Sequence, residues 1–118
     1  MQKLEEHLGK YDLTLGRWCL LVALKRGGRP MLPSELSDDL AVTRANISNL
    51  LNSLEKAGRI QRDFDPSNRR RILVRLTSDG EDLIAKVWPV YEETITEHIG
   101  KLSPENQTKL KELLNILF

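Results

Sequence analysis

The sequence contains a single cysteine, Cys19, among its 118 residues. One cysteine cannot form a disulfide within the chain, and a lone reduced thiol is typical of cytoplasmic proteins. No apolar run approaches the roughly 20 residues that a membrane-spanning helix requires. These absences predict a soluble, cytoplasmic protein that has no membrane partner and folds around its own apolar core.

Motifs for catalysis and metal binding are also missing. His7 and His98 are far apart and have no cysteine or acidic residue at the spacing of a metal site. The sequence has no glycine-rich phosphate loop and no Ser-His-Asp order. The cluster of Asp79, Glu81 and Asp82 falls at a predicted helix N-terminus, where negative charge is stabilising in itself. We therefore predict no enzyme activity, no catalytic residue, no metal and no cofactor.

Charge is almost balanced overall, at +1, but its distribution along the chain is uneven. Residues 43–76 hold eight Lys or Arg and three Asp or Glu, whereas residues 77–118 hold four and eight. A basic segment joined to an acidic tail concentrates positive potential on one surface. This distribution favours a nucleic-acid partner, although a set of solvated arginines would give the same balance.

Hydrophobic periodicity predicts a mainly helical single domain with one small β-hairpin. Thr14, Thr43 and Thr77 are typical helix N-caps, and Gly28 and Gly58 are typical residues at helix ends. A kink rather than a break is predicted at Pro89, because the apolar pattern resumes in register. The predicted helices are 2–10, 15–26, 33–40, 44–57, 79–99 and a last one from Pro104, and the predicted strands are 60–64 and 71–76.

The centre of the chain predicts a winged helix-turn-helix that binds a DNA duplex. Two short helices, joined by a turn at Ala41 and Val42, precede the hairpin. The second helix buries a leucine-rich stripe, and its opposite face is made of short polar residues that are mediocre helix formers. Helix propensity therefore does not explain why these residues occupy that face. Three consecutive arginines, Arg69, Arg70 and Arg71, mark the return of the hairpin.

The segments VTRANISNLLNSLEKAG and DPSNRRRILVRLTSDG resemble the MarR family of bacterial transcription regulators. The resemblance covers roughly residues 13–117. It implies a homodimer that binds a pseudo-palindromic operator, usually as a repressor and often released by a small ligand. It divides the domain into a DNA-binding part, about 32–77, and a dimerisation part, about 1–12 and 79–118. It also places six residues in the major groove: Arg44, Ala45, Asn46, Ser48, Asn49 and Asn52.

The basic residues around the second helix complete the predicted DNA-binding surface. Arg69, at the predicted tip, is the candidate for the minor groove, where narrow A·T tracts attract guanidinium groups. Contacts to phosphate are expected from Ser34, Arg59, Arg62, Arg70 and Arg71, although the arginines of the wing could instead bond the turn itself.

Three departures from the family pattern are present. Asn68 stands where the wing usually has Asp, so charge assistance to a neighbouring arginine is lost. Leu32 replaces the usual Ser or Thr cap, which weakens that helix start by about 1 kcal/mol. The first helix is short for a family that uses it in dimerisation and ligand binding, so a regulator without a ligand stays an alternative.

The aromatic residues and the cysteine each fit two roles. Trp18, Trp88 and Tyr91 suit either an aromatic effector pocket or plain packing, with packing favoured. Cys19 fits a buried small residue better than a redox sensor, because no second cysteine is present.

The polar helix face also bears on the kind of partner. A winged helix that docks on a protein is the rival function, although this face lacks the aromatics of such surfaces.

The predicted dimer interface comprises Leu4, Leu8, Leu110, Leu113, Leu114, Leu117 and Phe118.

Overall fold

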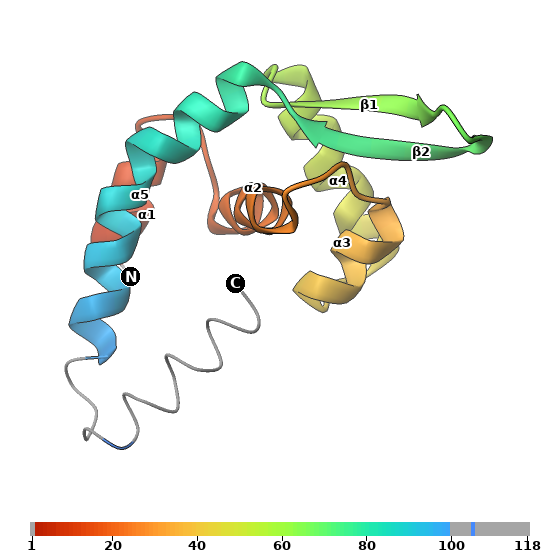
Figure 1. The fold of residues 1–118 in the computed structure, drawn as a ribbon. Helices are drawn as coiled ribbons and strands as arrows, with labels where there is room; N and C mark the ends of the chain where they lie inside the picture. The colour runs from red at the N-terminus through yellow and green to blue at the C-terminus, as the bar shows by residue number, and fades with distance from the viewer. Residues whose placement is uncertain (1, 100–104, 106–118) are drawn as a thin grey trace.

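The computed structural model describes residues 2–99 and 105 of the chain. Figure 1 shows α1 beside α5 at one end, while the hairpin projects at the other end next to α3 and α4. This order confirms the predicted mainly helical fold with a small β-hairpin. The elements are α1 (Gln2–Gly9), α2 (Leu15–Gly27), α3 (Pro33–Leu40), α4 (Arg44–Lys56), β1 (Ile60–Asp65), β2 (Asn68–Leu76) and α5 (Ser78–Ile99).

Local capping sets several of the helix boundaries, as the sequence predicts. The Thr14 hydroxyl accepts a hydrogen bond from the backbone N–H of Arg17 at 3.3 Å, and Thr43 accepts one from Asn46 at 3.2 Å. Gly28 ends α2 at φ 64°, and Gly58 follows α4 at φ 78°, in the left-handed region that a glycine adopts without steric cost. These interactions involve neighbours in the chain, which explains why the pattern alone could locate them.

The core is centred on α2, whose apolar residues face several elements at once. Trp18, Leu20 and Leu21 are fully buried, as their near-continuous apolar run predicts. Leu4 and Leu8 of α1 are also only 1% exposed, because α1 packs against α5 of the same protomer. Their predicted place in a dimer interface is therefore wrong: they fill the core of one protomer. The five remaining residues predicted for that interface lie outside the described part.

The two strands form an antiparallel hairpin whose base rests on the helices. Ile60 pairs with Leu76, and Val74 forms a further bridge with Met31, the residue two before α3. The backbone hydrogen bonds between Met31 and Val74 measure 2.9 and 2.7 Å. The sequence did not predict this bridge, which ties the start of the helix-turn-helix to the wing.

The long helix α5 begins at a tightly packed junction with the end of α4. Thr77 donates its hydroxyl proton to the Gly58 carbonyl at 2.6 Å and accepts the Gly80 N–H at 3.1 Å. A Cβ atom at Gly80 would overlap the Arg59 carbonyl oxygen. The helix runs through Pro89 without a break, as predicted, and its axis changes direction along its length (Figure 1). No helix in the described ranges is long and apolar enough to cross a bilayer.

Candidate nucleic-acid interface

The turn between α3 and α4 is held by a buried hydroxyl and a strained alanine. Ser37 donates its hydroxyl proton to the Val42 carbonyl at 3.1 Å, and the Val42 N–H returns to the Ser37 carbonyl at 3.2 Å. Ala41 adopts φ 53°, a left-handed conformation that is uncommon for a residue with a Cβ atom. These contacts fix the direction of α4 relative to α3.

Helix α4 buries one side and leaves the other free. Ile47, Leu51 and Leu54 are buried in the core, as predicted from their spacing. The opposite face is exposed, and on it Arg44 and Asn49 have no side-chain hydrogen bond to any described residue. The structure therefore gathers the predicted groove residues on one open surface: Arg44, Ala45, Asn46, Ser48, Asn49 and Asn52.

The three wing arginines lie in a bulge of β2, not at a terminal turn. Strand β2 begins at Asn68, three residues earlier than predicted, and Pro66 and Ser67 make the turn. Because Phe64 pairs with Ile72 while Asp65 pairs with Asn68, the three residues between have no partner on β1. Arg69 therefore lies at the distal end of the wing, in the bulge beside the turn at Pro66 and Ser67 rather than in the turn itself. All of Arg69, Arg70 and Arg71 are exposed.

Short side chains, not arginines, hold the wing turn together. Asn68 accepts the Arg70 backbone N–H through its Oδ1 at 3.1 Å, so the amide shapes the bulge. Asp65 accepts the backbone N–H and the hydroxyl proton of Ser67 at 2.9 and 2.8 Å, and these bonds lower the pKa of Asp65. Within the described residues, no guanidinium group of the bulge forms an ion pair or hydrogen bond. The alternative that the arginines bond the turn is therefore not what the structure contains.

Arg62, predicted to contact phosphate, is engaged within the protomer. Its guanidinium donates to Glu55 Oε1 at 2.8 Å and to Asn52 Oδ1 at 2.9 Å. The Glu55 carboxylate also accepts the Arg62 backbone N–H at 3.1 Å, and the pKa of Glu55 is lowered chiefly by its hydrogen bond with the Arg62 side chain. Arg62 thus braces the wing against α4. The contact also holds the side-chain oxygen of Asn52, a predicted groove residue.

The start of α3 compensates for its missing cap. Leu32 offers no side-chain acceptor, but the Glu35 carboxylate accepts the Leu32 N–H at 2.9 Å and pairs with Arg29 at 2.6 Å. The hydrogen bond from Arg29 is the main reason that the pKa of Glu35 is lowered, and the charge of Arg71 contributes. Ser34 is half-exposed beside this pair, at the positive end of the helix.

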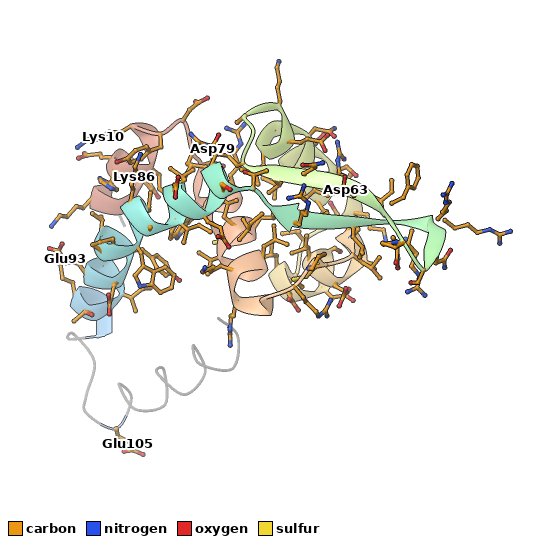
Figure 2. All side chains as sticks on the ribbon, turned by 45° about the horizontal axis from the view of Figure 1, so that its top comes forward. Lys10, Asp63, Asp79, Lys86, Glu93 and Glu105 are labelled. Carbon is orange, nitrogen blue, oxygen red and sulfur yellow. The ribbon has the colours of Figure 1, made fainter. Side chains whose placement is uncertain are left out.

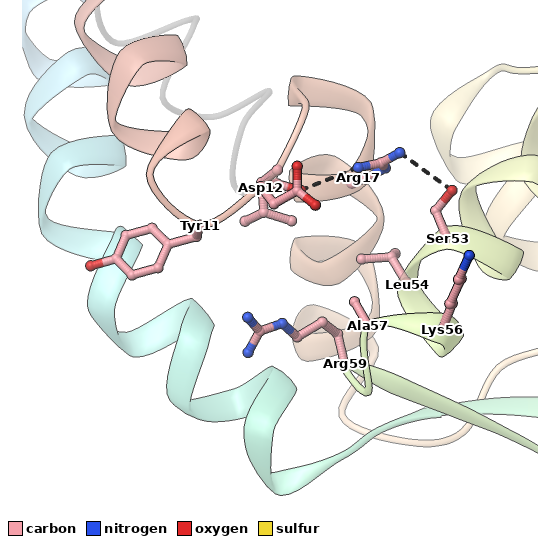
Figure 3. A pocket seen from close by; sticks show the side chains of 9 residues that line it. Tyr11, Asp12, Arg17, Ser53, Leu54, Lys56, Ala57 and Arg59 are labelled. Carbon is pink, nitrogen blue, oxygen red and sulfur yellow. Dashed lines mark hydrogen bonds between the residues drawn. The ribbon is translucent and has the colours of Figure 1, made fainter.

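A second group of cations, which the sequence did not single out as a unit, surrounds a hollow of about 480 Å³ beside the C-terminal half of α4 (Figure 3). Arg17 donates to the Asp12 carbonyl at 3.2 Å and to the Ser53 hydroxyl at 3.3 Å, which joins α2 to α4. Lys56 and Arg59 line the same hollow. Arg59 was predicted to contact phosphate, but Arg17 lies some 40 residues earlier in the chain. Only the folded chain brings them together.

The aromatic residues pack on one another, as favoured from the sequence. Trp18 and Trp88 each lie 5.3 Å from Tyr91 between ring centroids, and the two tryptophans are 6.4 Å apart. Trp18 is fully buried, whereas Trp88 is 39% exposed. Burial raises the pKa of the nearby Cys19 thiol, which disfavours the thiolate that a redox sensor would need.

His7 stacks edge-on against Tyr11 with 5.5 Å between ring centroids. Among residues 2–99 and 105, no three His, Cys, Asp or Glu side chains are grouped to hold a metal ion. The side chain of His98 is outside the described set.

Two short helices joined by a tight turn and followed by a hairpin define a winged helix-turn-helix protein. The chain belongs to the MarR family, whose pattern matches residues 11–71, more than half of its length. This membership confirms the resemblance and identifies a DNA-binding transcription regulator. The family consists of transcription regulators rather than enzymes. Because its members bind DNA, the membership favours DNA binding over the alternative of a protein-docking module.

Three relatives illustrate the similarity. The transcriptional regulator HosA of Escherichia coli is 28% identical over 96% of this chain and 87% of its own length. A variant of MepR from S. aureus, solved bound to an oligodeoxyribonucleotide, is 26% identical, with a TM-score of 0.74 over 98% of this chain and 85% of its own. BpsR of Bordetella bronchiseptica, whose DNA binding is regulated by 6-hydroxynicotinic acid, has a TM-score of 0.81 at 23% identity over 98% of this chain and 82% of its own.

Proposed function

We propose that this chain acts in the cytoplasm as a homodimeric repressor that binds a pseudo-palindromic operator. The observation that carries the proposal is the open face of α4 beside three wing arginines whose guanidinium groups form no hydrogen bond or ion pair among the described residues. Exposed, unpaired cations next to a helix with a free polar face match the charge and shape of a DNA duplex. The solved MepR complex with an oligonucleotide supports the same use of the fold.

The exposed residues divide by chemistry into base-reading and phosphate-binding groups. Arg44 suits a guanine edge, Asn49 an adenine edge and Ala45 the methyl group of thymine. Asn46, Ser48 and Asn52 line the same groove, although the side-chain oxygen of Asn52 is already held by Arg62. Arg69 enters the minor groove, while Ser34, Arg70 and Arg71 contact phosphates. We assign Arg62 to bracing the wing in place of the predicted phosphate contact.

Two-fold symmetry would place two α4 helices about 34 Å apart, one turn of DNA. Helix α5 and the residues that follow it would supply the dimer contacts, since Leu4 and Leu8 are used within the protomer. Release by a small aromatic effector is supported by BpsR, which responds to 6-hydroxynicotinic acid, and by the partly exposed ring of Trp88. Regulation without any ligand is the alternative.

The test compares two arginines of the same strand. Arg69→Ala should weaken binding to a duplex recovered from a random pool and reduce the salt slope by about one unit, because one cation is withdrawn from the duplex. Arg75→Ala is the matched control, because Arg75 is already paired with Asp63 at 3.0 Å on the other side of the ribbon. Equal slopes for wild type and Arg69→Ala would refute the contact assigned to Arg69.

A further inference from the structure

The wing ribbon has two chemically different faces. Residues opposite one another in an antiparallel pair point to the same side, and residues two apart along a strand do so as well. One side, the inner face, consists of Ile60, Arg62 and Phe64 of β1 and Ile72, Val74 and Leu76 of β2.

On the opposite face lie Gln61, Asp63 and Arg75, which bond to one another, and Leu73, which pairs with Asp63 and is half-buried. Arg75 donates to Asp63 Oδ2 at 3.0 Å and to Gln61 Oε1 at 2.6 Å, and Gln61 donates to Asp63 Oδ1 at 3.0 Å. All three of these polar side chains are therefore hydrogen-bonded within the ribbon. They offer a partner no unpaired side chain.

Coverage of the inner face stops partway along the wing. At the base, Ile60 and Val74 are 2% and 0% exposed, because α2, α3 and α4 pack against the strands. At the outer end, the cross-strand pair Phe64 and Ile72 is 67% and 44% exposed. Figure 2 shows the side chains beyond Asp63 standing clear of the helices. The apolar side of the ribbon thus continues past the body of the protein, where no described residue covers it.

The surroundings of Phe64 indicate what covers this end of the inner face. Phe64, Pro66 and Arg69 line one open hollow of about 620 Å³ together with Asp65. The Asp65 carboxylate is held by the N–H and hydroxyl of Ser67, whereas the Arg69 guanidinium has no described partner. Two apolar rings beside a free cation match the chemistry of a DNA strand, in which an apolar deoxyribose edge alternates with a phosphate.

A second copy of the chain does not suit this position. The wing and the α1–α5 pair lie at opposite ends of the protomer (Figure 1), so a dimer formed through α5 would leave the wing bare. The three arginines of the adjacent bulge also favour a polyanion. The observations therefore select DNA as the occupant.

We propose that Phe64 and Ile72 form an apolar wedge that packs on the deoxyribose edge of the minor groove, beside Arg69. This inference rests on the proposed function and extends it, since it assigns affinity to residues that carry no charge.

Hydroxyl-radical footprinting tests the wedge directly, because the radical reports which deoxyribose groups are covered. The probe is a duplex that the wild-type protein selects from a random pool. Phe64→Ala should expose the sugars at the flanks of the footprint, keep the central protection by α4, and weaken binding on the order of tenfold per wing. The salt slope should stay unchanged, since no ion pair is removed. Phe64→Leu should restore most of the affinity, and Gln61→Ala, on the polar face, should match wild type.

The possible outcomes separate this inference from the function on which it rests. If wild type binds its duplex and Phe64→Ala gives the same footprint and affinity, the wedge is refuted while DNA binding stands. A loss of the whole footprint in Phe64→Ala, with the thermal unfolding of the variant unchanged, would also refute a local contact at the flanks. If wild type protects no duplex, both the function and the wedge are overturned.

Discussion

Arg62 of β1 lies 2.8 Å from Glu55 of α4, and this ion pair is a side-chain link between the wing and the helix that faces the DNA. Both side chains are partly exposed, at 29% and 38%, so the pair contributes less than about 1 kcal/mol to folding. Its larger role is geometric. A wing that is not tied to α4 would sample several angles and contact the duplex less often.

Glu55→Gln should therefore weaken operator binding more than it weakens the fold. We expect a loss of unfolding free energy below about 1 kcal/mol, measured by urea denaturation, together with a clear drop in affinity. A double-mutant cycle with Arg62→Gln isolates the pair. If Arg62 instead contacts phosphate, Glu55→Gln would free it and raise non-specific affinity, and that result would contradict the bracing role.

The loss of folding stability at acidic pH should also depend on the Glu55 carboxylate. The pKa of Glu55 is lowered in the folded state, mainly by its hydrogen bond with Arg62, relative to its usual value of 4.5. A lowered folded pKa gives stability that is present above pH 4.5 and is lost as the pH falls through the folded pKa. Thermal unfolding between about pH 7 and about pH 3 should thus show a smaller acid loss for Glu55→Gln than for wild type. Parallel curves would show that the pair does not survive in solution.

Gly80 should be intolerant of even one added carbon. A methyl group there meets the Arg59 carbonyl, which is backbone and cannot move aside as a flexible side chain would. Gly80→Ala should lower the unfolding free energy by about 1–3 kcal/mol despite the better helix propensity of alanine. Gly9→Ala is the control, because no atom lies within 4 Å of its Cβ position. A Gly80→Ala protein as stable as the control would contradict the tight junction between α4 and α5.

At Ala41, a substitution by glycine should stabilise the fold. Its φ of 53° costs an alanine free energy that a glycine avoids. Ala41→Gly should raise the unfolding free energy by a few tenths to about 1 kcal/mol, after the greater entropy of the unfolded chain is subtracted. Ala57→Gly, at φ −81°, should be destabilising and serves as the matched control. Destabilisation by Ala41→Gly would mean that the turn between α3 and α4 is not left-handed.

The sequence predicted the features that depend on neighbours along the chain. Thr43 caps α4 and Gly28 ends α2 because each acts on residues within one helical turn. It failed where distant segments meet. The alternation of apolar residues begins only at Ile72, so it could not reveal that the arginines before it belong to a bulged strand. Nor could it reveal that Leu4 and Leu8 face α5 of the same chain, because an amphipathic helix does not specify its partner.

In the candidate site, too, the sequence predicted local features but not contacts between distant segments. The polar face of α4 was predictable from its 3.6-residue period, and the structure places those residues together. The engagement of Arg62 was not, because its partners Glu55 and Asn52 are reached only when β1 folds back beside α4. The exposure of Phe64 was also invisible, since an apolar residue in a strand is normally buried.

Asn49 should carry sequence information rather than general affinity. Its side chain is exposed on α4 and has no partner within the described ranges, and a free amide can pair with the edge of an adenine. Asn49→Ala should reduce the difference in affinity between the operator and single-base variants by about 1–3 kcal/mol at one position of each half-site. Binding to unrelated DNA should change little. Equal losses on every duplex would place Asn49 on the backbone instead.

Selection of bound duplexes from a random DNA pool, at near-physiological salt, shows directly whether the protein is a dimer that binds a palindromic operator. A homodimeric winged-helix regulator should enrich a pseudo-palindrome whose half-sites lie about ten base pairs apart, because two-fold symmetry places the two α4 helices one DNA turn apart. Enrichment of that motif is the predicted result. Recovery of DNA without a common sequence, or enrichment of a single unpaired half-site, would contradict the account of a dimeric repressor of a palindromic operator.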